Sequence, residues 1–182
     1  IPAIGDHQGA MALTIGVLAA LYRAKLTGQG EKVSTNLLHT AIWVQAFGIQ
    51  GAQYGTEFGG MTYPFDRRDN QLPYQPAVKT KDGRFLQVMG PNFGIYWGKI
   101  LQAIGRTDLL DDPVMSDQRA MIKENRLGEA YDVIQEGFAQ KTAAEWIPIL
   151  NELDVPVALC ATYDEVIKDE QAWANDVFYE MD

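Results

Sequence analysis

The stretch AVKTKDGRFLQVM, residues 77–89, decides the fold class because it predicts a β-hairpin within a largely helical chain. Segments 77–80 and 84–89 flank Lys81-Asp82-Gly83, and an Asp-Gly pair accepts the positive φ angles that tight turns require. Three helices, a strand, short helical turns and a last strand are expected next, at residues 92–104, 119–140, 142–153, 155–161, 163–174 and 177–180. This alternation predicts a compact α+β unit.

The first part of the chain predicts a different structure. Residues 9–26 carry apolar side chains on nearly every face of a helix, so we expect it to be packed on several sides. A short strand at 33–35 and a second apolar helix at 37–52 should follow. Residues 54–76 are rich in Gly and Pro and form an unusually long loop.

The predicted fold class is therefore mixed α+β, in two parts. Residues 1–53 supply two apolar helices that belong to another unit, and residues 54–76 act as a connector. Residues 77–182 form a small domain with a short sheet. Its third helix opens with Thr142-Ala-Ala-Glu145, a capping box that satisfies free N–H groups at the helix start. Within this domain, Trp97, Trp146 and Trp173 are expected to anchor the core.

Composition excludes several classes of partner. The 182 residues carry a formal net charge of −9, which repels nucleic acid and anionic membranes. The apolar run at residues 10–21 is too short to cross a bilayer and leads into Arg23 and Lys25, so it predicts a buried helix. We therefore expect neither nucleic acid nor membrane as a partner.

Cysteine and histidine are scarce. Cys160 is the single cysteine, and its apolar setting VPVALCATYD predicts a buried, inert thiol. With His7 and His39 as the two histidines, no cluster has the spacing of metal ligands, so no metal site is expected. No secretory signal is recognisable, and a reducing cytoplasm is the expected compartment.

Asp6 stands at the predicted start of the first helix. Its carboxylate is expected to cap the helix by accepting free N–H groups of the first turn, in preference to a catalytic role. His7 beside it has no recognisable partner and is expected to be a polar first-turn residue.

The run Arg67-Arg68-Asp69-Asn70-Gln71 is the candidate substrate or lid loop. Its guanidiniums suit a carboxylate or a phosphate, and its amides suit a polar substrate group. A solvated loop is the alternative, and composition alone favours it.

Five stretches occur in a fixed order along the chain. They are residues 5–38 (GDHQGAMALTIGVLAALYRAKLTGQGEKVSTNLL), 79–88 (KTKDGRFLQV), 97–116 (W…LQAIGRTDLLDDPVMS), 142–166 (TAAEWIPILNELDVPVALCATYDEV) and 168–182 (KDEQAWANDVFYEMD). Together they resemble the class III CoA-transferase family, also called CaiB/BaiF, which includes formyl-CoA transferase and carnitine CoA-transferase. The resemblance covers essentially the whole chain.

The resemblance implies a fold and an assembly. Members are longer chains with a large nucleotide-binding-like domain, an inserted small domain and long connecting segments. Two chains interlock as a homodimer. Residues 1–53 would then be the end of the N-terminal segment of a truncated large domain, 54–76 the connector and 77–182 the small domain.

The resemblance also implies the chemistry. An Asp carboxylate attacks an acyl-CoA thioester, and CoA moves to an incoming carboxylic acid through a covalent aspartyl intermediate. Coenzyme A is a substrate, and no cofactor is bound permanently. The nucleophilic Asp is expected upstream of Ile1, and Asp6 matches a later Asp, so no catalytic residue is assigned within this chain. The chain alone is expected to be inactive.

The same resemblance bears on the candidate loop. Formyl-CoA transferase covers its nucleophile with a glycine-rich loop whose place falls near residues 69–73 here. This chain has no glycine run there, which indicates a different substrate.

Two alternatives stay open. A 2-methylacyl-CoA racemase shares the fold and would use an acid/base pair, also expected upstream. A non-catalytic CoA-binding or assembly module would explain the missing nucleophile and the two apolar helices, which need a partner surface.

Overall fold

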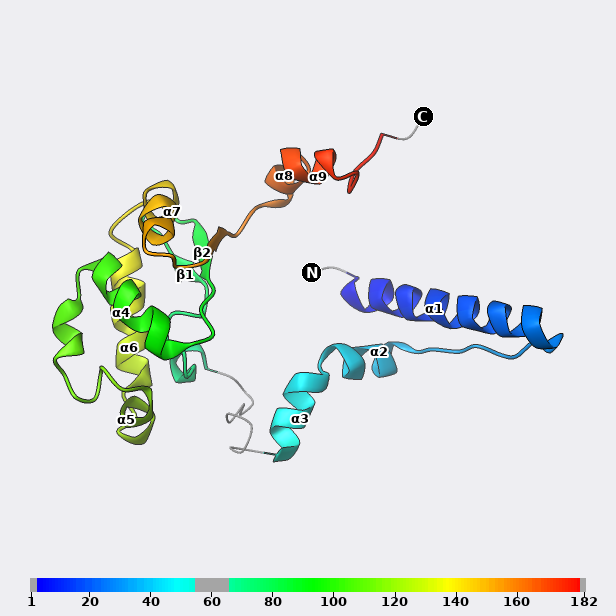
Figure 1. Cartoon of the computed structure of the whole chain (residues 1–182), viewed down its shortest axis with the longest axis horizontal. Coiled ribbons are helices and arrows are strands. Elements are labelled where there is room, and N and C mark those ends of the chain that lie inside the picture. Colours follow the sequence, from blue (N-terminus) through cyan, green and yellow to red (C-terminus); the bar gives the residue numbers. More distant parts are fainter. Residues whose placement is uncertain (1–2, 55–65, 181–182) are drawn as a thin grey trace. The chain divides into compact units, whose positions relative to one another are not determined.

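The computed structural model describes residues 3–54 and 66–180 (Figure 1). The chain divides into two units, Ile1–Phe65 and Asp66–Asp182. The first unit contains α1 (Ile4–Thr27), α2 (Leu37–Val44) and α3 (Ala46–Tyr54). The second contains η2 (Arg67–Asp69), β1 (Val78–Lys79), β2 (Phe85–Val88), α4 (Phe93–Ile104), η3 (Thr107–Leu110), α5 (Gln118–Lys123), α6 (Leu127–Phe138), α7 (Ala143–Glu152), β3 (Val157–Leu159), α8 (Tyr163–Val166) and α9 (Glu170–Ala174). The mixed α+β prediction is confirmed.

The unit boundary lies earlier than the sequence predicted. Residues 66–76 belong to the second unit, where η2 lies against α6 and Tyr74 is fully buried in the core. Residues 66–76 of the expected connector 54–76 therefore pack as part of the second unit. Residues 55–65 lie outside the described residues.

In the first unit, α1 and α2 pack against each other, and the strand expected at residues 33–35 does not form. Residues 29–36 have no regular structure and run along α1 instead of pairing with a strand. Gly16 makes this approach possible, because a Cβ at this position would lie 2.7 Å from Val33 Cγ1. The expected helix 37–52 is broken at Gln45 into α2 and α3.

Helix α1 is far more exposed than its all-round apolar sequence predicted. Its buried residues are Gly9 and Ala20, whereas Ile15 is 67% and Leu18 is 62% exposed within this chain. The prediction that this helix is too short for a bilayer is also wrong, because α1 has 24 residues. By length and composition alone it could cross a membrane, but buried core helices of soluble proteins and signal sequences share this length and composition.

The second unit is built on an antiparallel sheet in the order β1-β2-β3. The predicted hairpin is confirmed: Val78 pairs with Leu86, and Gly83 takes φ 76° in the turn. Along its other edge, β2 pairs with β3, where Leu86 lies opposite Leu159. The side chains of β2 alternate, so Leu86 and Val88 are fully buried while Phe85 is 41% exposed.

The helices that lie between β2 and β3 in the sequence cover the buried face of the sheet (Figure 1). Trp97 of α4 and Trp146 of α7 are buried, and each indole N–H donates to a backbone carbonyl, of Met115 at 2.7 Å and of Phe138 at 2.8 Å. Both were expected in the core, and both satisfy their polar atom there. The capping box of Thr142 and Glu145 is confirmed at the start of α7.

The helix expected at residues 119–140 is two helices, α5 and α6. Asn125 breaks it by taking φ 55°, a left-handed conformation that Asn tolerates, and the Arg126 N–H then bonds to Met121 O at 2.8 Å. The Arg126 guanidinium pairs with Asp112 at 2.9 Å and with Glu129 at 2.7 Å. The break therefore places a cation between two carboxylates.

Several C-terminal predictions are wrong. Residues 177–180 form no strand, and Trp173 is 42% exposed. Cys160 is exposed in this chain, because β3 ends at Leu159 and the following residues leave the core. Arg84 holds the start of this region through both carboxylate oxygens of Glu165, at 2.9 and 2.8 Å.

We predict that Leu86→Ala lowers the free energy of unfolding by about 2–5 kcal/mol, because it leaves a cavity beneath the central strand. Phe85→Ala is the matched control, since Phe85 is the next residue of β2 and points away from the core. Urea denaturation of both variants measures the difference. Equal losses would contradict the assigned face of β2.

We predict an acid-dependent contribution from Asp112. The N–H groups of Val114 and Met115, followed by the Arg126 guanidinium, hold the pKa of Asp112 below its usual value. A depressed pKa stabilises the folded state above the unfolded-state value of about 3.9, and this contribution disappears as the pH falls through the folded-state pKa. Asp112→Asn should therefore melt below the wild type at pH 7.

The gap in melting temperature between Asp112→Asn and the wild type should narrow below about pH 4. Asp111→Asn serves as the control, because the Asp111 carboxylate makes no hydrogen bond or ion pair within residues 3–54 and 66–180. A gap for Asp112→Asn that stays constant from pH 7 to pH 3 would argue against this carboxylate as its source.

Candidate functional site

The predicted loop residues 67–71 lie on the surface of the second unit. Arg67, Arg68 and Asp69 form the single turn η2, which starts where Asp66 Oδ1 accepts the N–H of Arg68 at 2.9 Å. Arg68 reaches α6 and pairs with Asp132. The guanidinium considered for a substrate carboxylate thus binds a carboxylate of the protein itself.

The rest of segment 66–76 is held to the second unit by hydrogen bonds and by a buried side chain. Asn70 Oδ1 accepts the N–H of Leu72 at 2.9 Å, and Gln71 O accepts a hydrogen bond from Gln118 of α5 at 2.8 Å. Tyr74 then inserts into the core, where its hydroxyl donates to Gly90 O at 2.8 Å. Burial raises the pKa of Tyr74, so this hydroxyl keeps its proton as a donor. Whether the loop covers a substrate stays a prediction.

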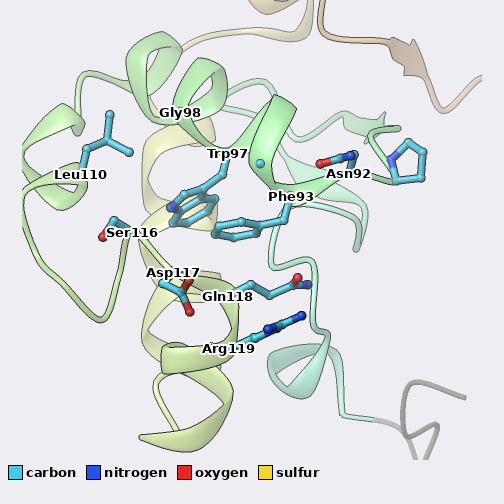
Figure 2. A pocket seen from close by; sticks show the side chains of 11 residues that line it. Asn92, Phe93, Trp97, Gly98, Leu110, Ser116, Asp117, Gln118 and Arg119 are labelled. Carbon is cyan, nitrogen blue, oxygen red and sulfur yellow. The ribbon is translucent and has the colours of Figure 1, made fainter. Parts of the chain in front are cut away.

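A pocket lies beside this segment, at the start of α4 (Figure 2). It has a volume of about 610 Å³ and is lined from within residues 91–98, by Leu110 and by residues 116–119. Phe93 stacks on Trp97 with ring centroids 5.3 Å apart, and Trp97 in turn stacks on Tyr74 at 6.3 Å. One aromatic stack therefore runs from the pocket to Tyr74 in segment 66–76.

Polar groups occupy the rim of the pocket. Asn92 precedes α4 and its side chain makes no capping bond, while Arg119 projects from the first turn of α5. Within the described part of the chain, the Arg119 guanidinium makes no hydrogen bond or ion pair. Asp117 also lines the pocket and uses one oxygen to accept the Ala120 N–H at 2.8 Å. The pocket combines an aromatic wall with an unpaired guanidinium.

Sequence reasoning missed the pocket. It singled out neighbouring arginines at 67 and 68, whereas the pocket uses Asn92, Phe93 and Arg119. The available signal was the aromatic pair at positions 93 and 97, one turn apart at a helix start. Nothing local linked this pair to Arg119, which belongs to another helix.

Asp6 lies in the first unit and is not the cap of its helix. Helix α1 begins at Ile4, so Ala3 is the N-cap residue and makes no side-chain capping bond, while Asp6 lies in the first turn. Its carboxylate still lies at the positive end of the helix dipole.

Comparison with known proteins identifies the family. The family model for CoA-transferase family III matches residues 1–182. The chain belongs to CoA-transferase family III. This membership accounts for the ordered stretches of sequence and confirms the predicted resemblance.

Two relatives of this family III chain are CoA-transferases. It is 38% identical over 181 residues to a cinnamoyl-CoA:phenyllactate CoA-transferase from Clostridium sporogenes, covering 100% of this chain and 43% of that protein. It is 34% identical over 175 residues to an (R)-2-hydroxy-4-methylpentanoate CoA-transferase from Clostridioides difficile, covering 96% and 42%. The chain spans less than half the length of these relatives.

A solved structure shares the fold of this family III chain. A CaiB/BaiF family protein from Brucella suis superposes with a TM-score of 0.74 at 20% sequence identity, over 96% of this chain and 44% of that one. At this identity the likeness establishes the fold alone.

We predict that the buried tyrosine, rather than the surface ion pair, holds segment 66–76. Tyr74→Phe leaves the buried Gly90 carbonyl without its donor and should cost about 1–3 kcal/mol. Arg68→Ala removes an ion pair whose side chains are 49% and 44% exposed and should cost less than about 1 kcal/mol. Urea denaturation measures both, and a larger loss for Arg68→Ala would reverse the assignment.

Proposed function

We propose that the protein moves CoA between an acyl-CoA and a carboxylic acid. The observation that carries the proposal is the match of family III over residues 1–182, joined by 38% identity to a CoA-transferase over 181 residues. No part of the chain falls outside this similarity, so its two units belong to one transferase architecture.

The proposed chemistry passes through an aspartyl intermediate. The Asp carboxylate attacks the thioester carbon and the C–S bond breaks. This step forms a mixed anhydride and releases CoA as a thiolate. The thiolate attacks the aspartyl carbonyl of the anhydride, which releases the donor acid as a carboxylate and leaves an aspartyl-CoA thioester. The acceptor carboxylate then attacks the aspartyl-CoA thioester, which releases CoA thiolate and forms a second mixed anhydride. The thiolate attacks the acceptor's carbonyl in this anhydride, which forms the new acyl-CoA and frees the Asp carboxylate. Bonds broken and formed balance, and no external oxidant or reductant is needed.

The proposal assigns the nucleophile to an Asp before Ile1, as the family resemblance implies, so residues 1–182 alone would not catalyse transfer. It also assigns the enzyme to a cytoplasmic homodimer. The exposed apolar side chains of α1 and α2, among them Leu18 and Trp43, are consistent with helices that pack against the rest of a large domain or against a second chain.

We predict that the intact protein, given cinnamoyl-CoA and phenyllactate, forms phenyllactyl-CoA and releases cinnamate. Mass spectrometry of the CoA esters measures the exchange. Hydroxylamine added during turnover should trap the aspartyl thioester as a hydroxamate and block the enzyme, because a thioester is far more reactive toward amines than a carboxylate. Omission of the acyl-CoA is the control and should leave the protein unlabelled.

Two results would contradict this proposal. One is the absence of CoA exchange with every acyl-CoA and acid tested. The other is uptake of solvent deuterium at the α-carbon of a 2-methylacyl-CoA without CoA exchange, which would identify a racemase.

A further inference from the structure

We propose that the pocket at the start of α4 binds the acid that receives CoA, and that this acid is a 2-hydroxy carboxylate with an aromatic or branched apolar side chain. The inference rests on the proposed transfer reaction. It assigns a binding role to Arg119 and Phe93, two residues that the sequence did not single out.

The size and wall of the pocket suit such a side chain. Its volume of about 610 Å³ exceeds what a small dicarboxylate fills, and Phe93, Trp97 and Leu110 supply the apolar part of a lining that is otherwise largely polar. Phe93 is half-buried and is supported from behind by the buried Trp97, so its ring offers a fixed apolar face (Figure 2). Gly94 and Gly98 contribute no side chain, which leaves the cavity open along α4.

The charge of the rim suits a carboxylate. Arg68, Arg84 and Arg126 of the same unit are each paired with a protein carboxylate. Arg119 is not paired within the described residues and lines the pocket. A guanidinium binds a carboxylate through two parallel hydrogen bonds, and the uncommitted amide of Asn92 can meet a 2-hydroxyl group.

Among the described residues that line the pocket, Asp117 is the one carboxylate, and it opposes anion binding there. One of its oxygens is held by the Ala120 N–H in the cap of α5. Figure 2 shows Asp117 and Arg119 projecting to different sides of the pocket, with Arg119 on the side of Gln118. The favourable end for a carboxylate is therefore the Arg119 end.

The acids named in the two relatives' activities fit this chemistry. Phenyllactate and 2-hydroxy-4-methylpentanoate are both 2-hydroxy acids, one with a phenyl ring and one with a branched alkyl chain. The aromatic wall of the pocket suits the apolar side chain of these acids, and the Arg119 guanidinium suits their carboxylate.

The pocket is also joined to the candidate loop. Gln118 lines the pocket and donates to Gln71 O at 2.8 Å, while the stack of Phe93, Trp97 and Tyr74 reaches the end of the same segment. An acid bound against Phe93 would lie beside the two contacts that hold segment 66–76, which are the Gln118 hydrogen bond and the aromatic stack. The loop's position would then depend on whether the pocket is occupied.

Isothermal titration of the intact protein with phenyllactate tests the site. Arg119→Ala should weaken binding by about tenfold or more, since it removes a charge-assisted hydrogen bond. Arg119→Lys should retain part of the affinity through its charge. Lys123→Ala is the matched control, because it removes a cation from the same helix outside the pocket and should leave binding unchanged.

A second variant narrows the cavity without changing its charge. A Cβ at Gly94 would meet only Asn92 Oδ1, at 3.5 Å, so this position in the pocket lining accepts a side chain in place of hydrogen. Gly94→Leu should weaken phenyllactate binding while the melting temperature stays at or above that of the wild type, because Leu favours a helix more than Gly does.

The outcomes separate this proposal from the transfer reaction. Binding of phenyllactate that is unchanged in Arg119→Ala and Gly94→Leu, or absent in the wild type, overturns the pocket assignment even if CoA transfer is observed. Weaker binding in both variants supports the pocket even if no CoA transfer occurs, in which case the transferase proposal fails alone. In an active enzyme, the KM for the acid should rise in Arg119→Ala while the KM for the acyl-CoA does not.

Discussion

Strand β2 must bond along both of its edges while burying Leu86 and Val88 on one face, and the second unit is organised around this requirement. The hairpin supplies β1 to one edge from the adjacent sequence, and β3 supplies the other from beyond four helices. Those helices provide the apolar cover that the buried face needs. The buried indoles of Trp97 and Trp146 could join this core because each N–H finds a backbone carbonyl within it.

The pocket is a by-product of the same packing. Trp97 is fixed as part of the core, and it presents Phe93 at the surface where α4 begins. Tyr74 is held on the other side of Trp97, so segment 66–76 and the pocket share one aromatic support. A surface site positioned in this way inherits the rigidity of the core beneath it.

Two short-range sequence signals predicted local structure correctly. The Asp-Gly turn and the capping box of Thr142 and Glu145 each act over a few residues, and the structure has both where the sequence predicted them. The single helix expected over residues 119–140 was wrong because periodicity does not reveal a left-handed Asn125. The exposure of Cys160 follows from where β3 ends, which an apolar run alone does not specify.

The functional residues were harder to predict because their partners are distant in sequence. Composition drew attention to Arg67 and Arg68, but it could not show that Asp132 already pairs with Arg68. It gave no reason to choose Arg119, whose interest comes from an unpaired guanidinium beside rings on another helix. The family was recognisable because the order of whole stretches carries more information than any one residue.

The far edge of β2 has a consequence for biosynthesis. Its partner Leu159 lies near the end of the unit, so the ribosome makes β2 and every covering helix before β3 exists. Until β3 emerges, one row of backbone donors and acceptors on β2 has no neighbour in the sheet, and such an edge is open to pairing with other chains. During synthesis, β2 therefore keeps one open edge after its hairpin with β1 is complete, until β3 has been made.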